Sequence, residues 1–167
     1  MLKINILHLI VSCFAGATAF LLLREARGRS LPPGQLFTAV PFAMATATLL
    51  LAMEAPETRE PRLWLAALVA GIALGAARGS FLKLQLDRMY ARLRLPSGRD
   101  GLRAACLLAL CALVAFGAAL VSLRDPALEI GATSAVAACA GYLSGRAVAL
   151  WSRSLSAPHQ TLRHILP

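Results

Sequence analysis

Few residues in this sequence have side chains that could catalyse a reaction or bind a ligand, and they lie within long apolar runs. His8 follows Asn5 by about one helical turn, and Arg146 lies near the end of the last apolar run. A bis-histidine haem site needs a second histidine, but His159 and His164 both fall in the tail. We therefore expect His8 to form a hydrogen bond at a membrane surface, and Arg146 to extend its guanidinium to headgroup phosphates.

The four cysteines do not have the spacing of a reactive or metal-binding site. Cys106 and Cys111 are five residues apart, which does not place them on one helical face, and no pair has the C-x-x-C spacing of redox and zinc centres. The sequence also lacks the phosphate-loop, zinc-hydrolase and serine-hydrolase motifs. We therefore expect no catalytic residue, no metal site, no cofactor and no enzymatic activity. The thiols expected to be buried and inert are Cys13, Cys106, Cys111 and Cys139.

The elements that hold these residues are expected to be membrane helices. The chain has 167 residues, of which 58% are hydrophobic and 15% charged, whereas soluble domains average about 25% charged residues. Crossing a hydrocarbon core of about 30 Å takes roughly 20 helical residues. We expect one all-α membrane domain over 1–167, a bundle of five transmembrane helices followed by a tail over 152–167. The expected spans are 4–23, 36–53, 63–82, 104–123 and 130–151.

Two of these spans contain local signals with consequences for their structure. The first offers A-x-A cleavage sites in "AGATA" and a loose lipobox ending at Cys13. Because the apolar run continues to Leu23 and ends in "REARGR", we expect a retained helix that is anchored by basic residues. In the second span, Pro41 predicts a kink near the start.

The net charge of +9 can indicate nucleic-acid binding, but the placement of the charges favours a membrane. Four basic residues fall on one side of the expected spans and 13 on the other, which is expected to be cytoplasmic. This orientation leaves the amino terminus outside a bacterial cytoplasmic membrane and the carboxyl terminus inside it. Anionic headgroups explain the basic excess without nucleic acid. The 13 are Arg24, Arg27, Arg29, Arg78, Lys83, Arg88, Arg92, Arg94, Arg99, Arg103, Arg146, Arg153 and Arg163.

Small residues recur at four-residue spacing on two of the expected spans. Helices in lipid associate through close packing, which small residues permit. These faces therefore predict contacts within a monomeric bundle or, as an alternative, an interface with a second copy or another subunit. The faces consist of Gly71, Gly75 and Gly79 on the third span, and of Ala137, Gly141 and Gly145 on the fifth.

The basic segment 81–95, between the third and fourth spans, has two interpretations. As a helix it has one apolar stripe, and as a hairpin it alternates leucines with polar residues. In both cases we expect an amphipathic element on the cytoplasmic surface, with its leucines in the membrane interface. Lys83, Arg92 and Arg94 are expected to dock on anionic headgroups or on an acidic partner. The hairpin would pair Leu82 with Leu95, Leu84 with Leu93 and Leu86 with Ala91.

Residues 71–123 carry a family resemblance. A span that ends in "RG" (Arg78, Gly79) is followed by "FLKLQLD" and "ARLRLP" and then by another span. This order resembles the CcdC-like family of small bacterial membrane proteins. The resemblance implies a short cytoplasmic hairpin between two membrane helices, and it implies no activity.

We expect a structural or accessory subunit of a membrane assembly, with membrane lipids and other subunits or further copies of the chain as partners. One alternative is a small oligomeric carrier, which needs a polar cavity between helices. A further alternative is a membrane enzyme with an acidic site on the outer face. The hydroxyls available to a carrier cavity are those of Ser12, Thr18, Thr46, Thr48, Ser122, Thr133 and Ser134. The acidic residues available to such an acidic site, which we expect instead to form a solvated rim on the outer face, are Glu54, Glu57, Glu60, Asp125 and Glu129.

Overall fold

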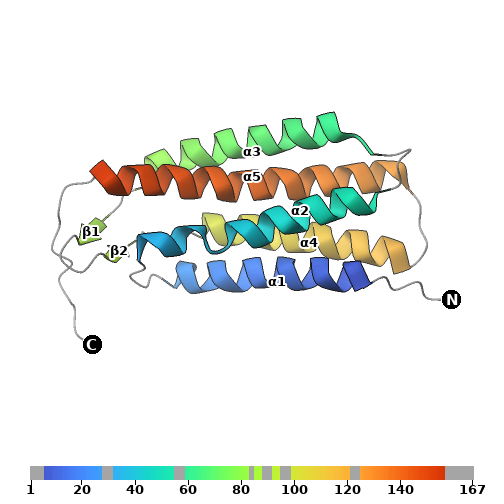
Figure 1. The fold of residues 1–167 in the computed structure, drawn as a ribbon, viewed down its shortest axis with the longest axis horizontal. Helices are drawn as coiled ribbons and strands as arrows, with labels where there is room; N and C mark the ends of the chain where they lie inside the picture. Colours follow the sequence, from blue (N-terminus) through green and yellow to red (C-terminus); the bar gives the residue numbers. More distant parts are fainter. Residues whose placement is uncertain are drawn as a thin grey trace.

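The chain folds into a bundle of five long helices (Figure 1). The computed structural model describes residues 6–27, 32–54, 59–82, 85–87, 92–94, 99–120 and 125–156. All five helical segments are long and apolar enough to cross a membrane, so the expected all-helical architecture with five candidate spans is confirmed. The helices are α1 (Ile6–Ala26), α2 (Val40–Met53), α3 (Pro61–Phe81), α4 (Asp100–Leu120) and α5 (Pro126–Ser156), with a 3-10 helix η1 (Pro33–Phe37) before α2 and the strands β1 (Gln85–Asp87) and β2 (Arg92–Arg94) between α3 and α4.

Successive helices run in opposite directions along the bundle (Figure 1). One end, here called the hairpin end, contains the last turns of α1, α3 and α5, the first turn of α4, η1 and both strands. The opposite end contains the first turns of α1, α3 and α5 and the last turns of α2 and α4. Of the 11 arginines in the described residues, nine lie at the hairpin end, and only Arg59 and Arg62 lie at the opposite end.

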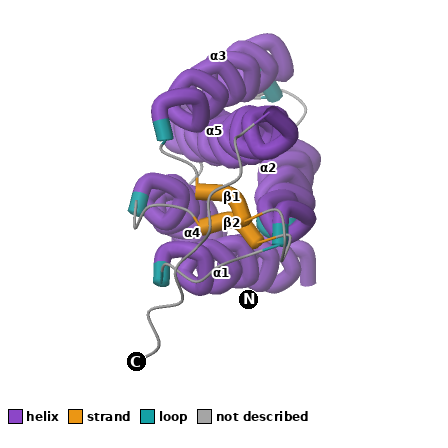
Figure 2. Tube along the Cα trace, turned by 90° about the vertical axis from the view of Figure 1, so that its left-hand side faces the viewer, coloured by secondary structure: helices purple, strands orange, loops and turns teal. Residues whose placement is uncertain are grey.

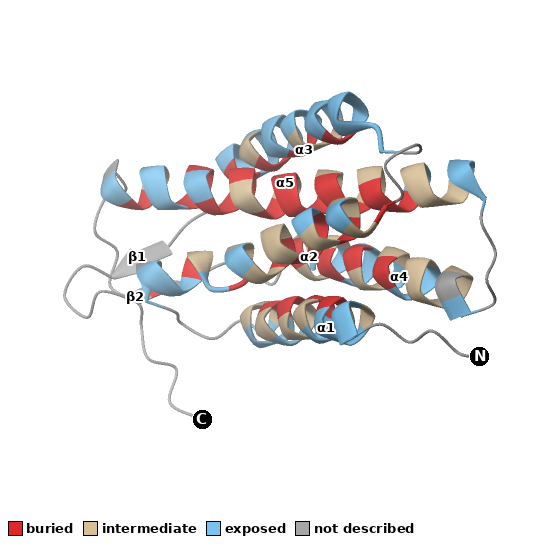
Figure 3. Cartoon of the chain, turned by 45° about the vertical axis from the view of Figure 1, so that its right-hand side comes forward, coloured by how far each residue is buried: buried red, intermediate tan, exposed pale blue. Residues whose placement is uncertain are grey.

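Helix α5 lies at the centre of the bundle (Figure 2). It packs against α2, α3 and α4, while α1 closes the far side against α2 and α4. Helix α3 is outermost and packs almost entirely against α5. Figure 3 shows the result, with buried positions along α5 and exposed positions over most of α3.

Glycines bring α3 and α5 into backbone contact. A Cβ on Gly71 or Gly75 would overlap the carbonyl oxygen of Ala138 or Tyr142 on α5. The contact is reciprocal, because a Cβ on Gly141 or Gly145 of α5 would overlap the carbonyl oxygen of Leu68 or Ile72 on α3. The two predicted small-residue faces therefore meet within one chain. Gly79 lies against Ala149, and Ala137 is fully buried in the core.

The second span begins with a short 3-10 helix that precedes α2. Pro41 is in the first turn of α2, where a proline lacks only an N–H that has no helical partner. The preceding turn is the separate helix η1, whose Gln35 carbonyl oxygen accepts a hydrogen bond from the Thr38 N–H (3.2 Å). Pro41 therefore lies near the start of the second span, as predicted, where η1 has ended and α2 begins.

The segment between α3 and α4 contains an antiparallel pair of strands, as in the hairpin interpretation. The observed register places Leu86 opposite Leu93 and Gln85 opposite Arg94. It differs by two residues from the predicted pairing of Leu86 with Ala91. A shift of two keeps every side chain on the same face of a strand, so alternation alone does not distinguish the two registers.

Leu93 attaches this hairpin to the bundle. Its side chain is fully buried and belongs to a small apolar cluster with Leu36 and Leu150, to which Phe37 and Leu82 add partly buried side chains. The prediction that the leucines of the segment lie in the membrane interface was therefore wrong for Leu93. Its contacts with η1 and α5 fix the register that alternation leaves open.

Candidate functional site

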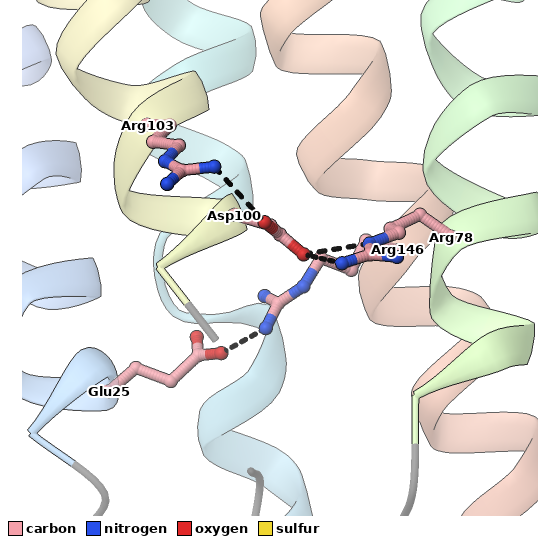
Figure 4. Close-up of polar contacts among 5 residues, drawn as sticks. All are labelled: Glu25, Arg78, Asp100, Arg103 and Arg146. Atoms are coloured by element: carbon pink, nitrogen blue, oxygen red, sulfur yellow. Dashed lines mark hydrogen bonds and ion pairs between the residues drawn. The ribbon is translucent and has the colours of Figure 1, made fainter. Parts of the chain in front are cut away.

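Two ion pairs connect four helices at the hairpin end, and we refer to them together as the charged layer (Figure 4). The inner pair joins α5 to α1, where Arg146 Nη2 donates a hydrogen bond to Glu25 Oε1 over 2.6 Å. Their side chains are only 7% and 13% exposed. A charge removed from water in this way is costly unless it is paired, which explains why the guanidinium and the carboxylate meet.

The outer pair joins α3 to the start of α4. Arg78 Nε donates to Asp100 Oδ2 over 2.7 Å, and Arg103 Nη1 lies 3.9 Å from Asp100 Oδ1 (Figure 4). Asp100 is the first residue of α4, where a carboxylate is favoured by the unpaired N–H groups of the first turn. The next residue is Gly101, whose missing side chain leaves room for the Arg146 guanidinium, since a Cβ there would lie 3.0 Å from Nη1.

The position of Arg146 corrects one prediction. Arg146 is 6% exposed and points into the bundle, so the expectation that it extends to headgroup phosphates was wrong. A buried guanidinium becomes stable when a carboxylate from another helix lies in reach, and Glu25 supplies it. The sequence contained a signal for this ion pair. The acidic residues expected on the same side as Arg146 are only Glu25, Asp87 and Asp100, so few carboxylates could be its partner.

Arg153 fastens the end of α3 to α5. Its Nη1 donates to the carbonyl oxygens of Gly79 (2.9 Å) and Leu82 (2.6 Å). The last carbonyls of a helix have no partner within the helix, so a guanidinium from α5 satisfies them. Gly79, predicted as a packing position, therefore also accepts a hydrogen bond from the helix that it contacts.

A small pocket lies beside Glu25, between the last turn of α1 and η1. Its volume is about 90 Å³, several times the roughly 10 to 15 Å³ that one water molecule needs. The polar groups that line it come from Arg24, Glu25, Gln35 and Thr38, and leucines from both elements complete the lining.

A second polar contact lies at the opposite end, between α2 and α5. Thr133 Oγ1 donates to Glu54 Oε1 over 2.5 Å, and Glu54 is 8% exposed. Burial raises the pKa of the Glu54 carboxyl above its ordinary value, the Thr133 hydroxyl opposes this shift, and the nearby Glu129 adds to it. Arg59 Nη2 donates to the carbonyl oxygens of Ala52 (2.9 Å) and Glu54 (3.1 Å), which satisfies the end of α2. Glu54 is therefore a buried carboxyl, whereas the sequence predicted a solvated acidic rim.

The remaining predicted residues divide between positions that the structure describes and positions outside it. Lys83 lies outside the described residues, and Arg92 and Arg94 form the ends of β2. The ring of His8 lies 5.8 Å from that of Phe116, and its buried Nδ1 has no hydrogen-bond partner among the described residues.

The cysteines correct a further prediction. All four are free, but only Cys139 is buried, while Cys13 and Cys106 are exposed on the surface of the bundle and Cys111 is partly buried. The expectation of four buried thiols was therefore wrong.

Of the hydroxyls proposed for a carrier cavity, Ser12, Thr18, Thr46 and Thr48 bond to the helices that carry them, whereas Thr133 reaches Glu54 on another helix. Thr18 Oγ1 donates to Phe14 O (2.8 Å), and Thr46 Oγ1 donates to Phe42 O (2.8 Å). Both threonines are fully buried. Ser12 bonds to the carbonyl oxygen of His8 (2.9 Å) in the same way. These groups are satisfied locally, as is common for hydroxyls in apolar helices.

The fold and the charged layer define an all-helical bundle with five candidate membrane spans and, at one end, a buried ion pair beside a more exposed one. Comparison with known proteins adds no relative, because no family model, no curated protein and no solved structure matches the chain.

Proposed function

We propose that the chain is an integral protein of a bacterial cytoplasmic membrane, with its amino terminus outside and its carboxyl terminus in the cytoplasm. The five apolar helices and the gathering of basic residues at the hairpin end support this orientation. Trp151, which is 44% exposed, lies at the hairpin end with its ring 6.2 Å from that of Phe37. Such aromatic side chains favour the headgroup level of a bilayer. The resemblance to the CcdC-like family remains a proposal about this topology.

We further propose that the protein acts as a structural or accessory subunit of a membrane assembly. The observation that carries this proposal is that two arginines of α5, Arg146 and Arg153, join that helix to α1 and α3. Arg146 is committed to Glu25, and Arg153 to the end of α3. A carrier is supported less well, because Thr18 and Thr46 bond within their own helices and are buried.

The proposed contact with partners and anionic lipids is at the hairpin end. Lys83, Arg92 and Arg94 are the residues that we assign to it, in an element held to the bundle by Leu93. Each basic residue near an anionic surface contributes about 1 kcal/mol, an effect that decays within a Debye length. The function of this segment would then be docking, and the affinity for partners and lipids would depend on the positive charge of these residues more than on whether each is lysine or arginine.

Co-purification in mild detergent tests this function. A variant with Lys83, Arg92 and Arg94 all replaced by Gln is expected to stay folded and membrane-bound, and to lose co-purifying subunits and anionic lipid already at low salt, whereas the wild type retains them at low salt and releases them as salt rises. The matched control replaces Arg59 and Arg62, at the opposite end, by Gln. This control is expected to retain the co-purifying subunits and the anionic lipid. Equal retention of partners and lipid by both variants would contradict docking through the hairpin.

A further inference from the structure

The pocket between α1 and η1 combines opposite charges within a small space. Arg24 is exposed, while Glu25 is largely buried, and both line the pocket with Gln35 and Thr38. Leu22 and Leu36 line its apolar part. A ligand that fills it therefore needs a negative group, a hydrogen-bond donor close to that group, and an apolar portion.

Glu25 keeps acceptor capacity for such a ligand. The described residues contribute one hydrogen bond to its carboxylate, from Arg146 to Oε1, and none to Oε2. Thr38 Oγ1 gives its proton to the carbonyl oxygen of Gln35 (2.8 Å), so its lone pairs remain available. These two oxygens suit an ammonium group, because charge-assisted hydrogen bonds to a carboxylate are roughly twice as strong as neutral ones.

Arg24 and Gln35 suit the opposite charge. The exposed Arg24 guanidinium forms no hydrogen bond within the described residues, and a guanidinium can bind a phosphate through two parallel hydrogen bonds. The side-chain amide of Gln35 adds a further donor. Phosphate and ammonium sites therefore adjoin one another along the last turn of α1.

The pocket also lies at the depth of lipid headgroups if the chain spans a membrane as proposed. It is at the end of α1 and the start of the second span, and its neighbour Phe37 packs against the exposed Trp151. We infer that the pocket binds the headgroup of a phosphatidylethanolamine lipid, with the phosphate at Arg24 and the ammonium at Glu25. This inference rests on the proposed membrane function.

A methylation series tests the ammonium contact on the unaltered protein. Delipidated protein is incubated with phosphatidylethanolamine, its N-methyl and N,N-dimethyl forms, phosphatidylcholine and phosphatidylglycerol, all with the same acyl chains, and bound lipid is counted by native mass spectrometry. Phosphatidylcholine keeps the phosphate and the positive charge but has no N–H donor. We expect about tenfold weaker retention of phosphatidylcholine, since one charge-assisted hydrogen bond is lost. Equal retention of these two lipids, or preference for phosphatidylglycerol, would overturn the inference.

Two variants locate the site. Arg24→Gln is expected to reduce retention of phosphatidylethanolamine severalfold, whereas Arg27→Gln, an exposed arginine one turn further on that does not line the pocket, is expected to leave it unchanged. The double variant Glu25→Gln with Arg146→Gln removes the carboxylate without leaving an unpaired charge and is expected to abolish the preference over phosphatidylcholine. Equal effects of Arg24→Gln and Arg27→Gln would place the lipid elsewhere.

Alkaline carbonate extraction separates this inference from the function on which it rests. A chain released into the soluble fraction would contradict the proposed membrane function. A chain that stays in the membrane but shows no headgroup preference would contradict the pocket assignment alone.

Discussion

Arg146 and Glu25 lie 121 residues apart in the sequence and are joined by a hydrogen bond of 2.6 Å between Nη2 and Oε1. Because both side chains are largely buried, each neutralises a charge that would otherwise be stranded away from water. The pair fixes the last turn of α1 against α5, although the main packing neighbours of α1 are α2 and α4.

Breaking this pair on one side is expected to destabilise the bundle. Arg146→Gln leaves the Glu25 carboxylate buried without a cation, at a cost of about 3 to 5 kcal/mol. The double variant Glu25→Gln with Arg146→Gln should recover most of that loss, because no uncompensated charge remains. Thermal unfolding in detergent measures the stability of the single and the double variant. A double variant that is as unstable as the sum of the single variants would show that the two residues do not stabilise each other.

Because α3 and α5 are in backbone contact, adding a single methyl group at this interface is expected to destabilise the bundle. Gly75→Ala places a methyl group against the Tyr142 carbonyl oxygen, so the two backbones must separate. We expect a loss of about 1 to 3 kcal/mol, as for other overpacked interiors, measured as a lower melting temperature in detergent.

Gly117→Ala, in α4, is the matched control for this substitution. A Cβ at Gly117 meets nothing within 4 Å, so stability should be unchanged or slightly higher. Equal melting temperatures for the Gly75 and Gly117 variants would argue against close packing of α3 on α5.

Glu54 predicts a pH dependence at the opposite end. Its pKa is raised above the ordinary value of 4.5, chiefly by burial, so the folded chain holds this proton more tightly than the unfolded chain. Its contribution to stability is therefore complete below about pH 4.5 and is lost as the pH rises through the raised pKa. Glu54→Gln, a neutral mimic of the protonated form, should remove this part of the pH dependence of the melting temperature. Glu60→Gln, at an exposed carboxyl, is the control, and identical pH profiles for wild type and Glu54→Gln would contradict the assignment.

The proposed orientation predicts which ends are accessible from outside the cell. In a cysteine-free background, an impermeant thiol reagent should label Glu60→Cys and leave Arg99→Cys unlabelled, because these exposed residues lie at opposite ends of the bundle. Membrane permeabilisation should then expose Arg99→Cys. The reverse labelling pattern would invert the topology.

The sequence predicted the helices well and their contacts only in part. Long apolar runs determine where a chain can span a membrane, so all five spans correspond to helices. The small-residue spacing likewise identified Gly71, Gly75, Gly141 and Gly145, since a close approach needs residues without side chains. It left open whether their partner was the same chain or another one, because spacing describes one helix and not its neighbour.

The errors arose where the rotation or register of an element decides the contact. Arg146 was expected in the headgroups because a position near a helix end is compatible with either direction, and only the nearby Glu25 favours the interior. The hairpin register was two residues off because both registers place Leu93 on the same face, and the choice depends on Leu36 and Leu150. Neither partner is a neighbour in the sequence.

The central place of α5 has a consequence for biosynthesis. Helix α3 leaves the ribosome before α5 is made. In the membrane topology that we propose, the face containing Gly71 and Gly75 therefore meets lipid first, and the α5 residues that it contacts are made 67 residues later. We expect the final helix to enter between segments that are already in the membrane. A chain stalled after Leu120 should then leave the Gly71 and Gly75 face of α3 open to lipid, and a chain that contains α5 should cover it. Translation of residues 126–156 would therefore be the step that commits the chain to its final assembly.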